Sequence, residues 1–412
     1  MADYRNVWML VASVTLLQLG GGVLGVLTPI GLDAFGVGTF GVGVVAALFS
    51  IGFMGGAWYA TPAIRAIGNI RVHAAGGAVM AITIQAMFLV QDVWSWSLIR
   101  LVQGAAMALM FSSIEAWLGA AMPANKRGSI SGFYHLMAKA ALIIGPFFVA
   151  GMPALMPHPY IWGSIFLCFS LMPLCLTRRE QPPVPDTDPL SMKQLFSLSP
   201  SAVFAIFIAG LVNTGLLSLL PIYAKSELSE LGLTATSLAA LAVAAVWMGG
   251  MISQWPAGRV SDHIDRRYVI AAMVAIASLA ALVLGMGTDL SPYLTLFLVW
   301  VWGAGALSYY GIAAAHIIDW CPPGKIAQAM AGILFVWALG SVIGPLLAGG
   351  VMLTPFGPRA LFLLAAIFGL FLTGIMLFRR TVRAEPPETG QEPWMPTTPL
   401  LAAKGEVDPR PD

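Results

Sequence analysis

The sequence predicts an all-α membrane protein with twelve transmembrane helices in two pseudo-symmetric six-helix bundles. Composition sets the class, because 58% of the 412 residues are hydrophobic and only 10% are charged, against roughly 25% charged residues in soluble globular domains. An internal repeat predicts that the chain consists of two similar halves, because Gly145-Pro146 recurs about 200 residues later as Gly344-Pro345. Duplicated membrane proteins often bind a solute between their repeats.

Each predicted span meets the need for roughly 20 mostly apolar residues, and polar, proline or glycine clusters separate it from the next span. The first span has the length to cross a bilayer and lacks a small-residue cleavage site, so we expect a retained helix rather than a signal peptide. In order, the spans lie near residues 7–32, 40–64, 72–90, 94–121, 129–151, 160–177, 200–223, 235–257, 268–287, 291–319, 326–352 and 359–378.

These spans divide the chain into an N-terminal bundle (1–177), a linker (178–199), a C-terminal bundle (200–380) and a tail (381–412). The linker is polar and rich in proline, which predicts a connection without a packed core. The tail is rich in proline, glutamate and glycine, a composition typical of disordered segments.

The distribution of basic residues predicts that both termini are cytoplasmic. Short cytoplasmic loops of membrane proteins accumulate lysine and arginine. Only Lys225 and Arg359 fall on the predicted outer side. The other side carries Arg65, Arg71, Lys126, Arg127, Arg178, Arg179, Lys193, Arg259, Arg266, Arg267, Lys325, Arg379, Arg380 and Arg383.

Several classes of function are excluded by the same composition. The basic residues lie in short loops rather than on one face, so nothing indicates a nucleic-acid partner. Cys168, Cys175 and Cys321 form neither a disulfide framework nor a CxxC metal site. No nucleophile-base or metal-ligand cluster appears, so we expect no enzyme activity, cofactor or metal.

The strongest local motif lies between the eighth and ninth spans. Asp262 stands four residues after Gly258, and Arg266 and Arg267 begin the next helix. The block resembles the loop signature of the major facilitator superfamily, Gly-x-x-x-Asp-x-x-x-Arg-Arg/Lys. The resemblance implies that Asp262 engages the start of the helix near Arg127 in the opposite half and stabilises the outward-facing state, since a helix N terminus attracts an anion.

The first-half copy of this motif is degraded. Counting back by the repeat from Asp262 reaches Pro62, and the segment keeps Arg65 and Arg71 but no acid. Ordinary basic loops explain the arginines but not Asp262. His316 and Asp319 lie close to the break at Cys321 and are expected near the same gate. The predicted cytoplasmic gate comprises Asp262, Asp265, Arg266, Arg267, Arg127 and Asp319.

A second match lies in the fourth span, where Arg100 precedes Gly104 by four residues. This spacing resembles the superfamily signature Arg-x-x-x-Gly, whose arginine lies within the membrane in many proton-coupled members. Arg100 is about 9 Å past Trp94 along a helix. It is therefore expected either to serve gating and proton coupling or to snorkel toward the membrane surface.

Glu115 is the leading candidate for proton coupling. It lies roughly 15 Å from the break at Asn125, and an ionised acid this deep is costly without a partner. His135 and Lys139 are one helical turn apart in the fifth span, at comparable depth. We expect a cluster of Glu115 with His135 and Lys139 that couples proton binding to a conformational change. The alternative is a structural ion pair that fastens the fourth and fifth spans.

The residues around Glu115 narrow the resemblance. Glu115-Ala116-Trp117-Leu118, followed by Arg127-Gly128 and Tyr134, is similar to the Glu-Ser-Trp-Leu, Arg-Gly and Tyr pattern of the YcaD-like branch of the superfamily. Ala116 replaces the serine of that pattern. The branch implies transport without indicating a substrate.

The Gly-Pro helices have two interpretations. A related Gly-x-x-x-Gly-Pro-x-x-Gly signature in the fifth helix resembles the mark of exporters, which favours export over import. Close helix packing with a proline-induced bend is the alternative. Here the fifth span lacks the preceding glycine, whereas the eleventh has it. The packing or hinge residues are Gly145, Pro146, Gly340, Gly344 and Pro345.

The remaining polar residues in the spans are candidates for a substrate cavity, although most such groups bond a neighbouring helix. They are Gln18, Asn213, Gln254, Trp255, Tyr309, Tyr310 and His316. Spans rich in Trp, Tyr, Phe and Met with few fixed charges suit an amphipathic or weakly charged organic solute. We expect a monomeric secondary transporter of the plasma (bacterial inner) membrane that moves a small organic solute by alternating access with proton coupling. The alternative is a transport-inactive sensor or assembly factor, which the missing acid at Pro62 supports.

Overall fold

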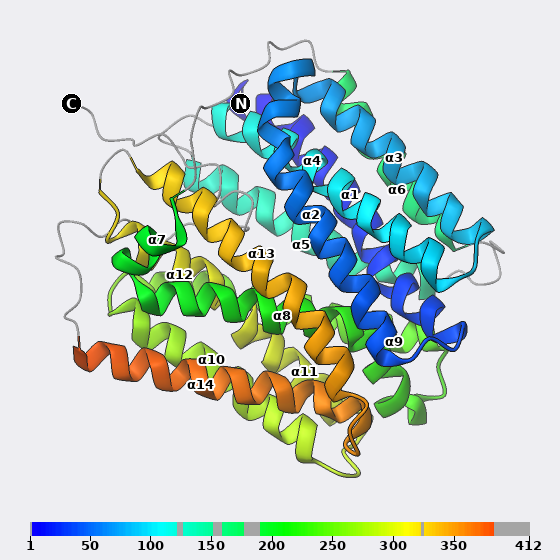
Figure 1. Ribbon diagram of the computed structural model, residues 1–412, viewed down its shortest axis with the longest axis vertical. Coiled ribbons are helices and arrows are strands. Elements are labelled where there is room, and N and C mark those ends of the chain that lie inside the picture. The colour runs from blue at the N-terminus through cyan, green and yellow to red at the C-terminus, as the bar shows by residue number, and fades with distance from the viewer. Residues whose placement is uncertain (1, 122–126, 151–158, 177–189, 323–324, 383–412) are drawn as a thin grey trace.

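The computed structural model describes residues 2–121, 127–150, 159–176, 190–322 and 325–382. Within these ranges the regular secondary structure is entirely helical. Figure 1 shows the helices in two groups, one from each half of the chain.

The described part of the N-terminal bundle contains six helices. Within it, α4 packs on α2 and α3, α1 packs on α5 and α6, and α3 packs on α6. The helices are α1 (Ala2–Ala34), α2 (Thr39–Ile67), α3 (Asn69–Leu89), α4 (Val93–Ala121), α5 (Arg127–Ala150) and α6 (Tyr160–Cys175).

The C-terminal bundle repeats this packing. Here α11 packs on α9 and α10, α8 packs on α13 and α14, and α10 packs on α14. The helices are α8 (Pro200–Glu227), α9 (Ala235–Ser261), α10 (Arg266–Met286), α11 (Pro292–Ala306), α12 (Tyr309–Ile318), α13 (Ile326–Val351) and α14 (Ala360–Val382). Each helix pair of the first bundle therefore has a counterpart in the second, as the repeat predicts.

Eleven of the described spans are long and apolar enough to cross a membrane. Helix α6 is apolar but only 16 residues long, or about 24 Å at 1.5 Å per residue. It packs on α1 and α3 as α14 packs on α8 and α10, so α6 occupies the sixth position of its bundle. The predicted spans match the observed helices within a few residues at most ends.

The tenth predicted span differs from the prediction of one continuous helix. Leu307 and Ser308 form a turn that divides it into α11 and α12. The physical reason is tertiary: Asn213 on α8 and Ser253 on α9, together with Ser308 of the turn itself, donate hydrogen bonds to backbone carbonyls at the end of α11.

Glycines bring equivalent helices into close contact in both bundles. A Cβ atom added at Gly104 would lie 2.0 Å from the Phe49 carbonyl oxygen, and one added at Gly303 would lie 2.3 Å from that of Val246. Either substitution would force backbone apart, so α2–α4 and α9–α11 require glycine at their crossings.

The described part of the linker contains a short helix, α7 (Met192–Leu198), rather than only irregular chain. Ser191 and Gln194 form a capping box at its start. The Leu190 amide donates to the Gln328 carbonyl at 2.9 Å, and Leu195 is 1% exposed. The linker therefore docks on α13. Residues 178–189 and the predicted tail beyond residue 382 lie outside the described residues.

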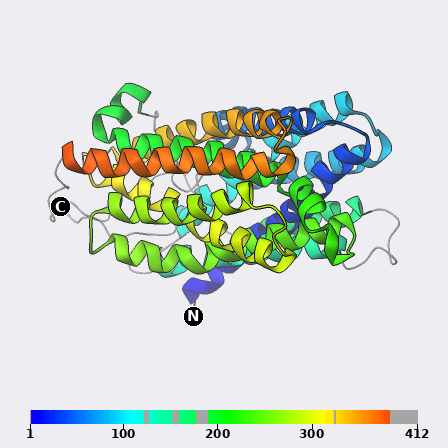
Figure 2. The ribbon, with the colours of Figure 1, turned by 90° about the horizontal axis from the view of Figure 1, so that it is seen from below.

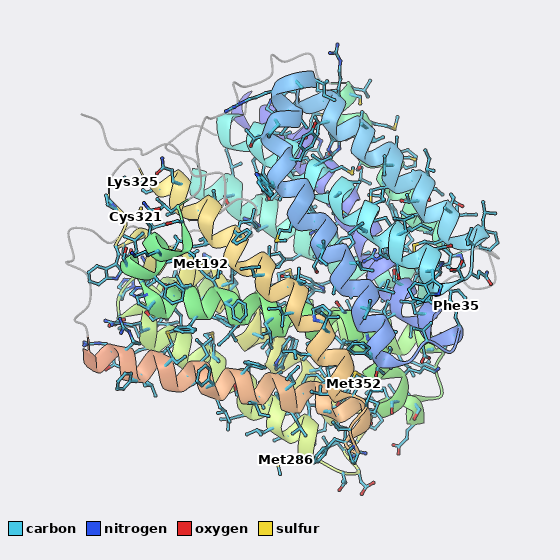
Figure 3. All side chains as sticks on the ribbon, in the orientation of Figure 1. Phe35, Met192, Met286, Cys321, Lys325 and Met352 are labelled. Atoms are coloured by element: carbon cyan, nitrogen blue, oxygen red, sulfur yellow. The ribbon has the colours of Figure 1, made fainter. Side chains whose placement is uncertain are left out.

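The bundles join through a continuous core at one end of the molecule. The core of the C-terminal bundle extends to Leu32, Val42 and Trp96, whereas two separate clusters of buried residues lie within the N-terminal bundle. We call this the Asp33 end, and the opposite end, where α9 meets α10, the Asp262 end. Figure 3 labels Phe35 and Met352 at the former and Cys321 and Lys325 at the latter. In Figure 2, seen from below, helices of the C-terminal bundle, including α14, lie in front of those of the N-terminal bundle.

Candidate functional site

Glu115 on α4 is almost completely buried, with 1% of its surface exposed. The carboxylate lies near the hydroxyls of Tyr134 on α5 and Tyr310 on α12. Both hydroxyls are buried and have no hydrogen-bond partner in the part of the chain that the structure describes. Because α12 belongs to the other bundle, a charge on Glu115 influences both sides of the bundle interface.

Lys139 on α5 donates a hydrogen bond to Oε1 of Gln254 on α9. This contact joins the two bundles near the middle of α5 and about two turns before the end of α9 at Ser261. The structure therefore gives Lys139 a cross-bundle amide partner rather than the carboxylate of Glu115. His135, one turn earlier on α5, is 5% exposed, and its ring lies edge-on to that of Tyr134 with centroids 5.2 Å apart.

Arg100 lies on the α2 side of α4. Its Nη1 donates to Oε1 of Gln103 at 2.9 Å, and its guanidinium carbon lies 4.1 Å from the centre of the Phe49 ring. The guanidinium is thus held by an amide oxygen and an aromatic face. Such a position matches an intramembrane arginine more closely than one that snorkels to the membrane surface.

A series of aromatic rings leads from Phe49, beside Arg100, across the bundle interface. The Phe49 and Phe53 rings on α2 are 6.4 Å apart, and the Phe53 ring meets that of Trp337 on α13 edge-on at 6.3 Å. Apolar aromatic surface therefore lies between the bundles at the mid-length of α2 and α13.

The break between α11 and α12 is supported by three side chains. Nδ2 of Asn213 donates to the Ala306 carbonyl at 2.9 Å. The hydroxyls of Ser253 and Ser308 both donate to the Ala304 carbonyl at 2.6 Å. Buried carbonyls that lose helix partners need such donors in a membrane. Asn213 therefore positions the turn that precedes Tyr309 and Tyr310, while its own Oδ1 lacks a partner among the described residues.

The predicted gate residues form an ion-pair network within the C-terminal bundle. Nε of Arg266 lies 2.8 Å from Oδ2 of Asp319, and Nη1 of Arg266 lies 3.2 Å from Oδ1 of Asp262. Nδ1 of His316 is 4.0 Å from the same Asp319 oxygen. Arg266 thus ties the α9–α10 loop to the end of α12. The side chain of Arg127, the predicted partner of Asp262, lies outside the described residues.

A second ion-pair group lies beside this network. Oδ2 of Asp265 is 2.8 Å from both Nη2 of Arg267 and Nε of Arg380 on α14. Burial alone raises the pKa of Asp265, but the hydrogen bonds and charge of Arg267 outweigh it and hold that pKa below its ordinary value. Asp265 therefore anchors α14 as a carboxylate.

At the Asp33 end, an ion pair and a backbone contact join the bundles. Nζ of Lys225 on α8 lies 2.6 Å from Oδ2 of Asp33 on α1. The Thr39 hydroxyl donates to the Gly349 carbonyl at 3.0 Å, and a Cβ atom added at Gly43 would lie 2.2 Å from the Pro345 carbonyl oxygen. Helices α2 and α13 are therefore in backbone contact at this end.

The Gly-Pro residues serve helix packing in the structure. A Cβ atom at Gly145 would lie 2.5 Å from the Leu19 carbonyl oxygen on α1. The corresponding distances are 2.2 Å from Gly340 to the Phe207 oxygen and 2.0 Å from Gly344 to the Leu211 oxygen, both on α8. Pro146 and Pro345 lie inside α5 and α13.

The other predicted cavity residues are dispersed. Gln18 is half-buried on α1, and Tyr309 is 3% exposed on α12. Trp255 is 56% exposed, and Arg259 stacks on its ring at 4.0 Å. The structure thus brings Glu115, Tyr310, Lys139, Gln254 and Asn213 to the bundle interface or the tenth-span break, and it places Trp255 on the surface of α9.

Sequence reasoning missed several polar groups. Ser253 and Ser308 support the helix break, and Arg380 completes the Asp265 group. His73 on α3 is 0% exposed, with Nε2 3.3 Å from the Ser13 hydroxyl oxygen and Nδ1 3.3 Å from the Met110 carbonyl. For Ser253, Ser308 and His73, the sequence signal that could have identified them is a polar side chain inside an otherwise apolar span. No group of three potential metal ligands occurs among the residues searched, which are those described above.

Comparison with known proteins identifies relatives across the whole chain. The chain is 23% identical over 385 residues to the uncharacterized MFS-type transporter YcaD of Salmonella typhi, which covers 93% of this chain and 98% of the relative. The YcaD protein of Salmonella arizonae gives the same identity and coverage.

Solved structures show the same fold. The nucleoside transporter NupG has a TM-score of 0.69 at 14% identity, covering 90% of this chain and 98% of its own. A bacterial homologue of the human lysosomal transporter Spinster, solved in an inward-facing and occupied conformation, has a TM-score of 0.71 at 14% identity, covering 96% and 99%. The Major Facilitator Superfamily model matches residues 10–284 and 204–408. The chain is a transporter-type protein that belongs to the Major Facilitator Superfamily.

Proposed function

We propose that the chain is a proton-linked secondary transporter that carries a small organic solute by alternating access. The observation that carries this proposal is the position of Glu115. Its carboxylate is buried on α4, near the buried Tyr310 of the opposite bundle. Binding or release of a proton there changes the charge between the bundles, and a differential interaction of this kind is what shifts a conformational equilibrium.

The arrangement of cross-bundle contacts supports alternating access. The contacts of Asp33 with Lys225, Thr39 with Gly349 and Gly43 with Pro345 lie at the Asp33 end. The contact of Lys139 with Gln254 lies at mid-length of α5 and in the half of α9 that leads to the Asp262 end. We propose that the Asp33 end is extracytoplasmic and closed here, with the termini on the cytoplasmic side of a plasma (bacterial inner) membrane. The working unit is proposed to be one chain.

The solved structural relatives include transporters of this class. They include a nucleoside transporter, a peptide transporter and a fucose:proton symporter of E. coli. Export is the favoured direction from the Gly-Pro signature. The packing role of Gly145 and Gly344 also fits import, so the direction of flux has to be measured.

The test is flux in vesicles containing purified protein and a trapped pH-sensitive dye. A panel of small organic solutes is added with and without an imposed pH gradient. The proposal predicts solute-dependent proton movement that Glu115→Gln abolishes and the exposed-lysine control Lys193→Gln keeps. Solute flux of equal gradient dependence in wild type and Glu115→Gln would refute proton coupling through Glu115.

A second function remains a defined outcome of this experiment. Pro62 occupies the position at which the internal repeat would place the counterpart of Asp262, and it lies within α2. The acid of the loop motif is therefore present in only one half of the chain. Solute binding detected by tryptophan fluorescence without any flux would favour a membrane sensor over a transporter.

A further inference from the structure

We propose that the solute is an amphipathic organic acid, with the Lys139 ammonium as the ion partner of its anionic group and the Gln254 amide beside it. This inference rests on the proposed function and names the class of its substrate. The inference follows from the net charge of the side chains that lie in the middle of the protein, where the two bundles meet.

Few charged residues lie deep within the described membrane-spanning helices. Three are at least six residues from both ends of their helix: Arg100, Glu115 and Lys139. Two of the three are cations. The middle of the protein is therefore net positive when Glu115 is ionised, and more so when it is protonated. An organic cation entering this region meets a charge of its own sign, whereas an anion is attracted.

Both cations are held by neutral groups. Lys139 bonds the amide oxygen of Gln254, and Arg100 bonds the amide oxygen of Gln103 and stacks on Phe49. In addition, Nε of Arg100 has no partner in the described part of the chain. An amide dipole orients a cation but does not neutralise its charge, and an uncompensated charge within a membrane is costly. A bound anion supplies the missing compensation.

Lys139 is the better placed of the two cations for direct contact. Its hydrogen-bond partner Gln254 lies on the opposite bundle, whereas the partner of Arg100, Gln103, lies on the same helix as Arg100. An anion at this position can pair with the ammonium while the Gln254 amide nitrogen donates a hydrogen bond to it. The same contact then spans α5 and α9, so the ligand touches both bundles. Arg100 contributes positive potential from α4.

The apolar part of the solute is indicated by the aromatic contact between bundles. Phe53 and Trp337 meet at mid-length of α2 and α13, comparable to the depth of Lys139 in α5. Aromatic side chains contribute large apolar surface. A solute with one acidic group and an apolar or aromatic body therefore matches this interface better than a polyanion does.

The test measures binding before transport. Purified wild-type protein is mixed with a panel of aryl-alkyl carboxylates, their uncharged amides and the amines of equal length, and thermal stability is followed by tryptophan fluorescence. Dissociation constants are then determined for the stabilising compounds on wild type, Lys139→Gln, Lys139→Arg and the control Lys193→Gln, in which an exposed lysine on α7 is replaced.

The expected result is selective stabilisation by carboxylates, an affinity loss of tenfold or more in Lys139→Gln, and recovery of most affinity in Lys139→Arg. Binding of the uncharged amides should change little, which separates an anion partner from a purely structural residue. Preference for amines or amides, a panel without a stabilising carboxylate, or equal carboxylate affinity in wild type and Lys139→Gln would overturn the proposal. Carboxylate binding without flux would uphold it and instead count against transport.

Discussion

Nζ of Lys225 lies 2.6 Å from Oδ2 of Asp33, and this ion pair joins the first helix of one bundle to the first helix of the other. The lysine side chain is 51% exposed and that of the aspartate 27%. Exposed pairs contribute about 0.2–1 kcal/mol. A contact of this strength biases the closed state of the Asp33 end while leaving it able to open.

Removal of this pair should therefore open the Asp33 end slightly. Asp33→Asn is expected to increase the open population about twofold, from a loss of roughly 0.5 kcal/mol. The measurement is the labelling rate of a cysteine at Phe40, beside the closure, by a membrane-impermeant maleimide in a background lacking the three native cysteines. High salt should reduce the difference, because it screens exposed pairs. An unchanged rate at low salt would contradict the role of the pair.

The α2–α13 contact offers a stronger test of closure. Gly43→Ala places a methyl group against the Pro345 carbonyl and should oppose closure by about 1–3 kcal/mol, the usual cost of overpacking. The matched control is Gly55→Ala on the same helix, where an added Cβ meets nothing within 4 Å. Labelling at Phe40 should rise sharply in the first variant only. Similar rates in both would show that this contact does not limit opening.

The Arg266–Asp319 pair should matter for stability. Both side chains are almost completely buried, 3% and 2% exposed, and removing one charge of a buried pair typically costs about 3–5 kcal/mol. Asp319→Asn should clearly lower the melting temperature in detergent. Asp289→Asn, on an exposed loop, is the control for the same chemical change. If the two variants have the same melting temperature, the Arg266–Asp319 pair does not hold α12 to α10.

The Asp265 group predicts a dependence of stability on pH. The folded-state pKa of Asp265 lies below its ordinary value because of Arg267. Its stabilising contribution is therefore complete above the ordinary aspartate pKa of about 3.9 and is lost as pH falls through the lower folded value. Wild type should lose stability on acidification in that range, and Asp265→Asn should lose less. Parallel melting curves for the two proteins would exclude this contribution.

The spans were predictable because each depends on a local excess of apolar residues. The paired halves were predictable because Gly145-Pro146 and Gly344-Pro345 repeat in sequence. The break at Leu307 was not, since it depends on Asn213 and Ser253, which are distant in sequence and reach Ala306 and Ala304 only after folding.

The spacing of charged residues in the sequence could not predict which of them contact one another. Glu115, His135 and Lys139 have compatible depths along their helices, which predicted one cluster. Depth does not fix the direction in which a side chain points, and Lys139 turns toward Gln254 on α9. Arg266 and Asp319 were both assigned to the gate, but their direct pairing depends on how α12 crosses α10.

The central claim is that the two bundles rock so that one end opens as the other closes. Distances between spin labels test it most directly, with one pair across the Asp33 end at Phe40 and Leu353 and another across the Asp262 end at Ile67 and Ile264, in vesicles at high and low pH. The account predicts opposite changes at the two ends on acidification and little change in Glu115→Gln. Fixed distances at both ends, or both ends widening together, would contradict it.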